Sequence, residues 1–140
     1  MSVVFVYGTL LAPEILSIVL GRNVRREDYR PATAKCFRRY ALPDRPYPVM
    51  RSSAADETTG AVITTITDEE LKRLDHFEAT LYKRQLIDVI TTNGNMQAFA
   101  YVDPRTDTLS ANEWSREAFE RDHLHAYIER TKNWMNGYRR

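Results

Sequence analysis

The chain has 140 residues, the length of one ordinary domain, and we expect residues 1–140 to form a single domain. Lys and Arg total 20 and Asp and Glu total 19, so a formal charge of +1 gives no electrostatic basis for nucleic acid or an anionic membrane as the main partner. The single cysteine excludes an internal disulfide and a cysteine-based zinc site.

The N-terminal segment carries no targeting signal that we recognise. The apolar run within residues 1–8 is too short for the core of a signal peptide, and no basic residue precedes it. No stretch approaches the roughly 20 apolar residues that a membrane-spanning helix needs. We therefore expect a cytoplasmic protein with no membrane partner.

A strand, a tight turn and a helix are predicted at the start of the chain. Val3–Val6 is apolar and rich in β-branched residues, which is typical of a buried strand, and the strand stops before Gly8. Pro13 suits the first turn of a helix and Gly21 its end. Apolar residues between them recur at helical spacing, namely Ile15, Leu16, Val19 and Leu20.

Two further strands are predicted next, over Thr33–Leu42 and Gly60–Ile66, the second being dense in β-branched residues. The proline-rich segment 43–48 between them is expected to be a loop, because each proline removes a backbone donor. Cys36 falls in the first of these strands. We expect it to be a small buried apolar residue and not a nucleophile.

A second helix should follow. Thr67 and Glu70 have the spacing of a capping box, in which each side chain binds a free amide at the helix start. The helix should run to about Phe77, with three apolar residues on one face, namely Leu71, Leu74 and Phe77.

The last part of the chain predicts a hairpin and a long helix. Tyr82–Thr92 and Met96–Val102 alternate as strands, and residues 93–95 between them read Asn-Gly-Asn, a hairpin signal. Ser115–Met135 is amphipathic with aromatic residues on one face. About five strands and three helices predict an α+β fold with a mixed sheet or a small barrel.

The first candidate site is the segment Tyr7-Gly8-Thr9-Leu10. A buried strand that ends at a glycine and leads into a helix presents free backbone N–H groups, which can hold a carboxylate or a developing oxyanion. The same pattern also describes an ordinary turn, and the residues alone leave both interpretations open.

The second candidate is Glu78, which falls at the predicted end of the second helix, next to Phe77. A carboxylate half-sunk among apolar side chains has a raised pKa and is able to take and return a proton. The alternatives are that Glu78 is solvated at the helix end or pairs with Arg84. A metal site is not expected, because His123 and His125 are two residues apart and point in different directions on a helix.

Both candidates occur in one family pattern. The chain resembles the gamma-glutamylcyclotransferase-like superfamily, most closely its avirulence-induced-gene-like branch. The matching segments run in order from residue 3 to residue 102: Phe5-Val6-Tyr7-Gly8-Thr9-Leu10, Pro13-Glu14-Ile15-Leu16, Leu20-Gly21-Arg22, Tyr47-Pro48, Gly60, and Leu74-Asp75-x-Phe77-Glu78-x-x-x-Tyr82-x-Arg84.

The resemblance implies a small mixed β-barrel surrounded by helices. It also implies that the backbone amides of Tyr7, Gly8, Thr9 and Leu10 hold a γ-glutamyl group and that Glu78 is the general acid/base. Tyr82 and Arg84 complete the pattern and are interpreted as supports around Glu78, with Arg84 pairing with Asp75 or with a substrate carboxylate. Tyr101 is a further possible lining residue, although an inward aromatic on a strand is commonly part of a core.

The implied activity is that of a γ-glutamyl cyclotransferase, which releases 5-oxoproline and an amine from a small γ-glutamyl amine or peptide and needs no metal or other cofactor. The loop after Leu10 and the pair Thr9-Leu10 differ from those of better-known relatives, so the substrate does not carry over. Two alternatives stay open: a non-catalytic module that binds a small metabolite, and an interaction protein that uses Trp114, Tyr127 and Trp134, which are otherwise expected to be core.

Overall fold

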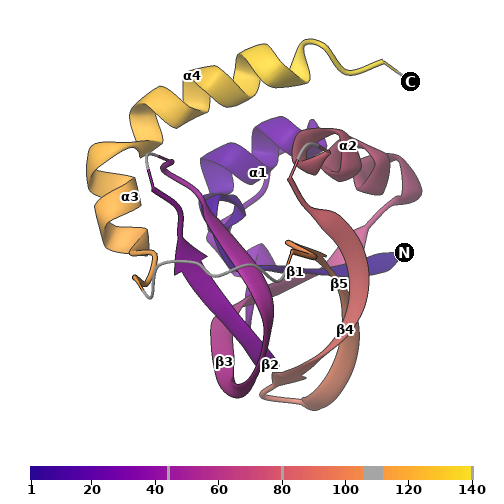
Figure 1. The fold of residues 1–140 in the computed structure, drawn as a ribbon. Helices are drawn as coiled ribbons and strands as arrows, with labels where there is room; N and C mark the ends of the chain where they lie inside the picture. Colours follow the sequence, from indigo (N-terminus) through magenta and orange to yellow (C-terminus); the bar gives the residue numbers. More distant parts are fainter. Residues whose placement is uncertain (44, 80, 106–111, 140) are drawn as a thin grey trace.

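The computed structural model describes residues 1–43, 45–79, 81–105 and 112–139 (Figure 1). The strands are β1 (Ser2–Val6), β2 (Arg30–Ala41), β3 (Pro48–Ile66), β4 (Lys83–Thr91) and β5 (Gly94–Val102). The α-helices are α1 (Pro13–Leu20), α2 (Asp68–Glu78), α3 (Arg116–Asp122) and α4 (Leu124–Met135), and the short 3₁₀ helices are η1 (Thr9–Leu11) and η2 (Arg26–Asp28). Among these residues, no helix combines the length and apolar character needed to cross a membrane.

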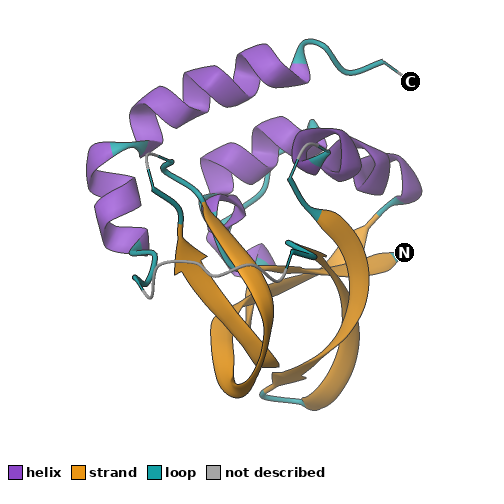
Figure 2. Ribbon diagram, in the orientation of Figure 1, coloured by secondary structure: helices purple, strands orange, loops and turns teal. Residues whose placement is uncertain are grey.

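The five strands close into a barrel in the order β1–β3–β2–β4–β5, with α1, α2 and α4 gathered at one end of it (Figure 2). All neighbours in the ring are antiparallel except β1 and β5, which run parallel. The barrel is therefore mixed, and the predicted α+β class with a small mixed barrel is confirmed.

Strand β1 is buried on both faces, which explains its unbroken apolar sequence. Val4 and Val6 belong to a core shared with the helices, in which Ile15 and Leu74 are fully buried. Phe5 alternates with them and belongs to a second core formed mainly by strand residues. Because both faces of β1 are buried, its end is fixed between the barrel and the helices. The start of the following loop is fixed in the same place.

The prediction for β3 was too short, because the strand begins at Pro48 and not at Gly60. Its first half holds several polar residues and a single β-branched residue before residue 58, Val49, but it pairs with β2, where Lys35 lies opposite Glu57. Pro48, which was predicted to lie in a loop, is the first residue of the strand, a position that proline tolerates. Asp44 of that predicted loop lies outside the described residues.

The prediction for Cys36 was also wrong, because its side chain is exposed. The residue has a φ of 66° and lies where the register between β2 and β3 shifts, between Lys35 and Phe37. An extra residue of this kind leaves the alternation of the strand, so its side chain does not follow the inward pattern of its neighbours.

The single C-terminal helix predicted over 115–135 is two helices, which meet at His123. No glycine or proline marks the break, so the sequence pattern did not reveal it. The change of direction places α3 beside the barrel and lays α4 across α1 and α2 (Figure 1).

The contact between β1 and β3 allows no side chain at Gly60. A Cβ atom built there would lie 2.2 Å from the carbonyl oxygen of Val6 and 2.9 Å from Cζ of Phe5. We therefore expect Gly60→Ala to lower the free energy of unfolding by roughly 1–3 kcal/mol or more, measured by urea unfolding. Gly137→Ala is the matched control, because its nearest contact would be an ordinary 3.4 Å, and equal losses in the two variants would contradict this account.

Candidate active site

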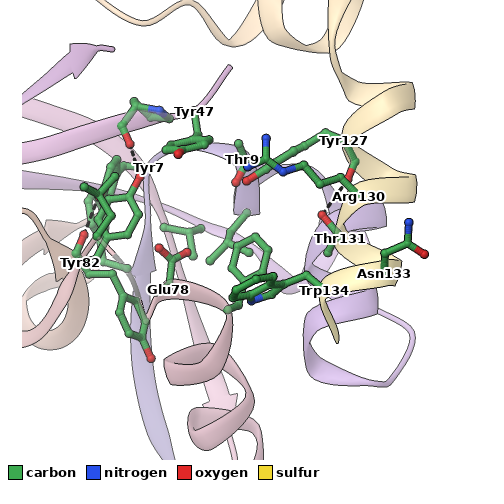
Figure 3. A pocket seen from close by; sticks show the side chains of 18 residues that line it. Tyr7, Thr9, Tyr47, Glu78, Tyr82, Tyr127, Arg130, Thr131, Asn133 and Trp134 are labelled. Atoms are coloured by element: carbon green, nitrogen blue, oxygen red, sulfur yellow. Dashed lines mark hydrogen bonds between the residues drawn. The ribbon is translucent and has the colours of Figure 1, made fainter. Parts of the chain in front are cut away.

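A cavity of about 620 Å³ lies between the barrel and α4. Its walls come from the loop after β1, the start of β3, the end of α2 and one face of α4 (Figure 3). The structure brings to this cavity all but one of the residues singled out from the sequence, namely Tyr7, Gly8, Thr9, Leu10, Glu78, Tyr82 and Tyr101. Arg84 does not line it.

Helix α2 positions Glu78, its last residue, and is held at three points along its length. The predicted capping box is present: the Glu70 amide donates to Oγ1 of Thr67 at 3.1 Å, and the Thr67 amide donates to Oε1 of Glu70 at 3.0 Å. Leu74 is fully buried in the core. Arg73 donates from Nε to the carbonyl oxygen of Val19 at 2.6 Å, which ties α2 to the end of α1. The position of Glu78 therefore depends on a helix that cannot easily shift.

The Glu78 side chain lies in the wall of the cavity and is 9% exposed. Burial raises the pKa of its carboxyl group from 4.5 to about 8. Within the described residues no hydrogen bond or ion pair joins this carboxylate to another side chain, so nothing there offsets the cost of removing its charge from water. Near neutral pH the group is therefore poised between its acid and base forms.

The neighbours of Glu78 are phenols. Burial, with a smaller contribution from the Glu78 charge, raises the pKa of Tyr7, Tyr82, Tyr101 and Tyr127 above the usual value for tyrosine. All four tyrosines therefore stay neutral in the pH range where Glu78 titrates, so their hydroxyl groups add no charge near its carboxylate.

Arg84 lies against Asp75 and not against Glu78. One of its guanidinium nitrogens is 3.4 Å from the Asp75 carboxylate, and the Tyr101 hydroxyl donates to the same carboxylate at 2.7 Å. The expected pairing of Arg84 with Asp75 is therefore confirmed, and the alternative in which Arg84 pairs with Glu78 is wrong. A cation next to Glu78 would lower its pKa, so the ion pair with Asp75 helps to keep the pKa of Glu78 high.

The loop after β1 lines the cavity and has backbone N–H groups without a backbone acceptor among the described residues. Leu11 donates to the Gly8 carbonyl and begins η1, but the N–H groups of Gly8, Thr9 and Leu10 have no backbone acceptor in the described part of the chain. Pro48 packs directly on Gly8, where a Cβ atom would lie 2.8 Å from Cγ of the proline ring. The Tyr82 hydroxyl donates to the Pro48 carbonyl and holds this contact in place.

The carbonyl groups of the same loop are bound by side chains outside the cavity. Arg39 donates to the oxygen of Tyr7 at 2.8 Å, and the Tyr29 hydroxyl donates to the oxygen of Leu10 at 2.7 Å. Arg116 donates to the oxygen of Leu11 at 3.2 Å. These hydrogen bonds to the carbonyl groups fix the orientation of the peptide planes. The N–H groups of the loop are then the backbone groups that remain for a ligand.

Sequence reasoning missed the wall formed by α4. Tyr127, Arg130, Thr131 and Trp134 line the cavity from that helix, and Tyr47 joins them from the segment before β3 (Figure 3). Trp134 was expected in the core but is 45% exposed. The i, i+3, i+4, i+7 spacing of the four α4 residues was visible in the sequence, but it predicts a buried face equally well.

Trp134 is fixed to the end of α2. Its indole nitrogen donates to the carbonyl oxygen of His76 at 3.2 Å, a His76 ring nitrogen lies 3.3 Å from the carbonyl oxygen of Trp134, and the two rings stack at 5.6 Å. This contact attaches α4 to α2 two residues before Glu78.

Comparison with known proteins identifies the group to which this site belongs. The model of the family described as "Gamma-glutamyl cyclotransferase, AIG2-like" matches residues 4–138. The chain belongs to this AIG2-like family. The AIG2-like protein D of Arabidopsis thaliana is 30% identical over 138 residues, which cover 96% of this chain and 89% of that protein.

Solved structures agree with the AIG2-like fold. The solution structure of an Arabidopsis thaliana protein is 29% identical and superimposes with a TM-score of 0.72, covering 96% of this chain and 82% of that one. A structure titled gamma-glutamyl cyclotransferase is 16% identical, with a TM-score of 0.57 and coverage of 94% and 86%. At that identity the likeness concerns the fold alone.

The raised pKa of Glu78 links stability to pH. The unfolded chain loses this proton near pH 4.5 and the folded protein near pH 8, so the contribution of Glu78 to the free energy of unfolding falls as the pH rises between these values. Glu78→Gln has no proton to lose. Its stability relative to the wild type should therefore rise through this window and level off above it, by an amount on the order of a few kcal/mol.

Urea unfolding of the wild type and Glu78→Gln, below pH 4.5 and above pH 8, measures this difference. Glu57→Gln is the control, because Glu57 lies outside the cavity and is half-exposed next to Lys35. A stability difference for Glu78→Gln that does not change with pH would show that the carboxylate is not desolvated as described.

Proposed function

We propose that this AIG2-like protein is a γ-glutamyl cyclotransferase that converts a small γ-glutamyl amine or peptide into 5-oxoproline and a free amine. The observation that carries the proposal is the meeting, in one cavity, of a buried carboxylate with a pKa of about 8 and a loop with three free backbone N–H groups. Family membership supports the same reaction.

The substrate supplies its own nucleophile in this reaction. Its α-amine attacks the γ-carbonyl carbon, a bond forms between that nitrogen and carbon, and the bond from the carbon to the outgoing nitrogen breaks. Because nucleophile and electrophile belong to one molecule, the protein mainly has to hold the substrate folded back on itself. No step requires a cofactor or a protein nucleophile.

Glu78 has the properties of the single acid/base that the reaction needs. As a carboxylate it takes a proton from the α-ammonium group, and as a carboxylic acid it returns that proton to the outgoing nitrogen. The second proton that the attacking nitrogen loses as the lactam forms passes to the released amine, which becomes an ammonium ion, or to solvent. A group with a pKa near 8 can perform both steps near neutral pH. An ordinary glutamate with a pKa of 4.5 would be a poor acid for the second step.

The Tyr7–Leu10 loop has the donors that the tetrahedral intermediate needs. Negative charge develops on the γ-oxygen as the amine adds, and fixed N–H groups aimed at that oxygen would stabilise it. Because side chains behind the loop hold its carbonyl groups, little reorganisation is needed when the charge appears.

Activity should depend on the Glu78 carboxylate. Purified protein is offered γ-glutamyl dipeptides, γ-glutamyl amines and glutathione, and 5-oxoproline is measured by mass spectrometry. Glu78→Gln should lower kcat/KM by roughly 10²–10⁴-fold while the protein keeps its circular dichroism spectrum. Glu57→Gln again serves as the control and should keep full activity.

Two results would decide against the proposal. Unchanged turnover in Glu78→Gln would remove Glu78 from the mechanism. Binding of γ-glutamyl compounds in a thermal-shift assay, without product from any of them, would instead identify the protein as a non-catalytic metabolite-binding module.

The pH dependence of turnover should report the same group. The carboxylate form takes the first proton, so kcat/KM should rise with pH, about tenfold per unit, until it levels off near pH 8. Initial rates at low substrate concentration across this range give the profile. A profile in which kcat/KM levels off near pH 4.5 would show that Glu78 titrates as an ordinary glutamate during catalysis.

A further inference from the structure

The cavity extends well beyond the reacting groups. Its volume of about 620 Å³ lies within the range of roughly 300–1,000 Å³ that accommodates drug-sized ligands, whereas 5-oxoproline is one small ring. Tyr7 and Glu78 lie on one side. The other side is formed by Tyr47 and the α4 face, with Thr9 of the loop beside Tyr127, and it has room for the amine that leaves (Figure 3).

This second side is aromatic and carries one cation. The rings of Tyr47 and Tyr127 stack with their centroids 6.3 Å apart. Arg130 lies over both, with Cζ 5.9 Å from the centre of the Tyr47 ring and 5.7 Å from that of Tyr127. Among the described residues that line the cavity, Arg130 is the sole basic side chain.

The Arg130 guanidinium remains available to an anion. Within the described part of the chain no carboxylate lies in ion-pair distance of it, whereas Lys132 on the same helix pairs with Glu129 at 3.4 Å. Stacking on aromatic rings uses the face of the guanidinium and leaves its N–H donors free for two parallel bonds to a carboxylate. Arg130 therefore presents an uncompensated charge at the edge of the cavity.

The chemistry of the reaction indicates where a substrate carboxylate would meet Arg130. Glu78 must reach both the attacking and the outgoing nitrogen, and the room in the cavity beyond Glu78 lies toward Tyr47 and α4, so the group beyond the outgoing nitrogen would occupy that part. In a γ-glutamyl amino acid that group bears a carboxylate one carbon from the nitrogen. Its side chain would then lie among the rings of Tyr47, Tyr127 and Trp134.

We propose that Arg130 binds a carboxylate on the outgoing amine, so that the site selects γ-glutamyl amino acids and peptides, above all those with an apolar or aromatic side chain, over γ-glutamyl amines. This inference rests on the function proposed above and adds a substrate class to it. Arg130 acts in substrate selection and takes no part in proton transfer.

Two substrates that differ in one carboxylate test the proposal. γ-Glutamyl-phenylalanine and γ-glutamyl-phenethylamine share the glutamyl group and the aromatic ring, but only the first carries a carboxylate on the outgoing amine. The wild type should prefer the first by roughly 10- to 100-fold in kcat/KM, the range of one charge-assisted interaction. Arg130→Met should lose most of that preference, and Arg130→Lys should keep part of it.

The control is Lys132→Met, which removes a cation from the same helix but outside the cavity and should leave the preference unchanged. Equal losses on both substrates in Arg130→Met would place Arg130 on the glutamyl carboxylate and overturn the inference, and so would a wild type that does not discriminate. Both results leave the cyclotransferase function intact. A wild type that forms no 5-oxoproline from any γ-glutamyl compound would overturn the function itself, and the inference with it.

Discussion

The desolvation of one carboxylate is the constraint on which the rest of this site depends. Glu78 is buried against phenols, and the nearby guanidinium of Arg84 pairs with Asp75 instead. A charged group in such a place is costly unless it is neutralised, so its pKa rises. The helix that ends in Glu78 must be held firmly, because a small shift would return the carboxylate to water. The capping box, the buried Leu74 and the bond from Arg73 to α1 provide that hold.

The barrel supplies the second half of the site through close backbone contacts. Gly60 lets β3 approach β1 at Val6, and Gly8 lets Pro48 pack against the loop. Neither position has room for a Cβ atom, so both glycines are needed for close packing and not only for a turn of the backbone. The result is a loop that lines the same cavity as Glu78. Side chains outside the cavity bind carbonyl groups of this loop, and three of its N–H groups have no backbone acceptor in the described part of the chain. The proposed acid/base and the proposed oxyanion donors thus come from different elements that share one core.

Helix α4 gives the cavity its shape beyond the reacting centre. The paired contacts between Trp134 and His76 attach it to α2, and the stack of Tyr47 on Tyr127 attaches it to the segment before β3. Its face combines aromatic rings with the free charge of Arg130, which suits an outgoing group that is both apolar and anionic. In the proposed reaction, the Tyr7 loop and Glu78 would carry out the chemistry, and α4 would decide which amine leaves.

Local sequence patterns were enough to predict the elements near the reacting groups. The apolar run of β1, the glycine after it and the capping box of α2 are patterns that lie within a few residues of the structure they produce. The position of Glu78 at a helix end was predicted from such local patterns. The first half of β3 has no local pattern that predicts a strand, because its polar residues are held in a strand by pairing with β2. The exposure of Cys36 and the bend at His123 likewise arise from register and packing. The sequence by itself, through the family pattern, indicated the Tyr7 loop and Glu78, the residues that are proposed to carry the chemistry. Only the tertiary structure decided that Glu78 is desolvated, that Arg84 is paired elsewhere and that one face of α4 lines a cavity, because burial and charge pairing depend on residues far apart in the chain.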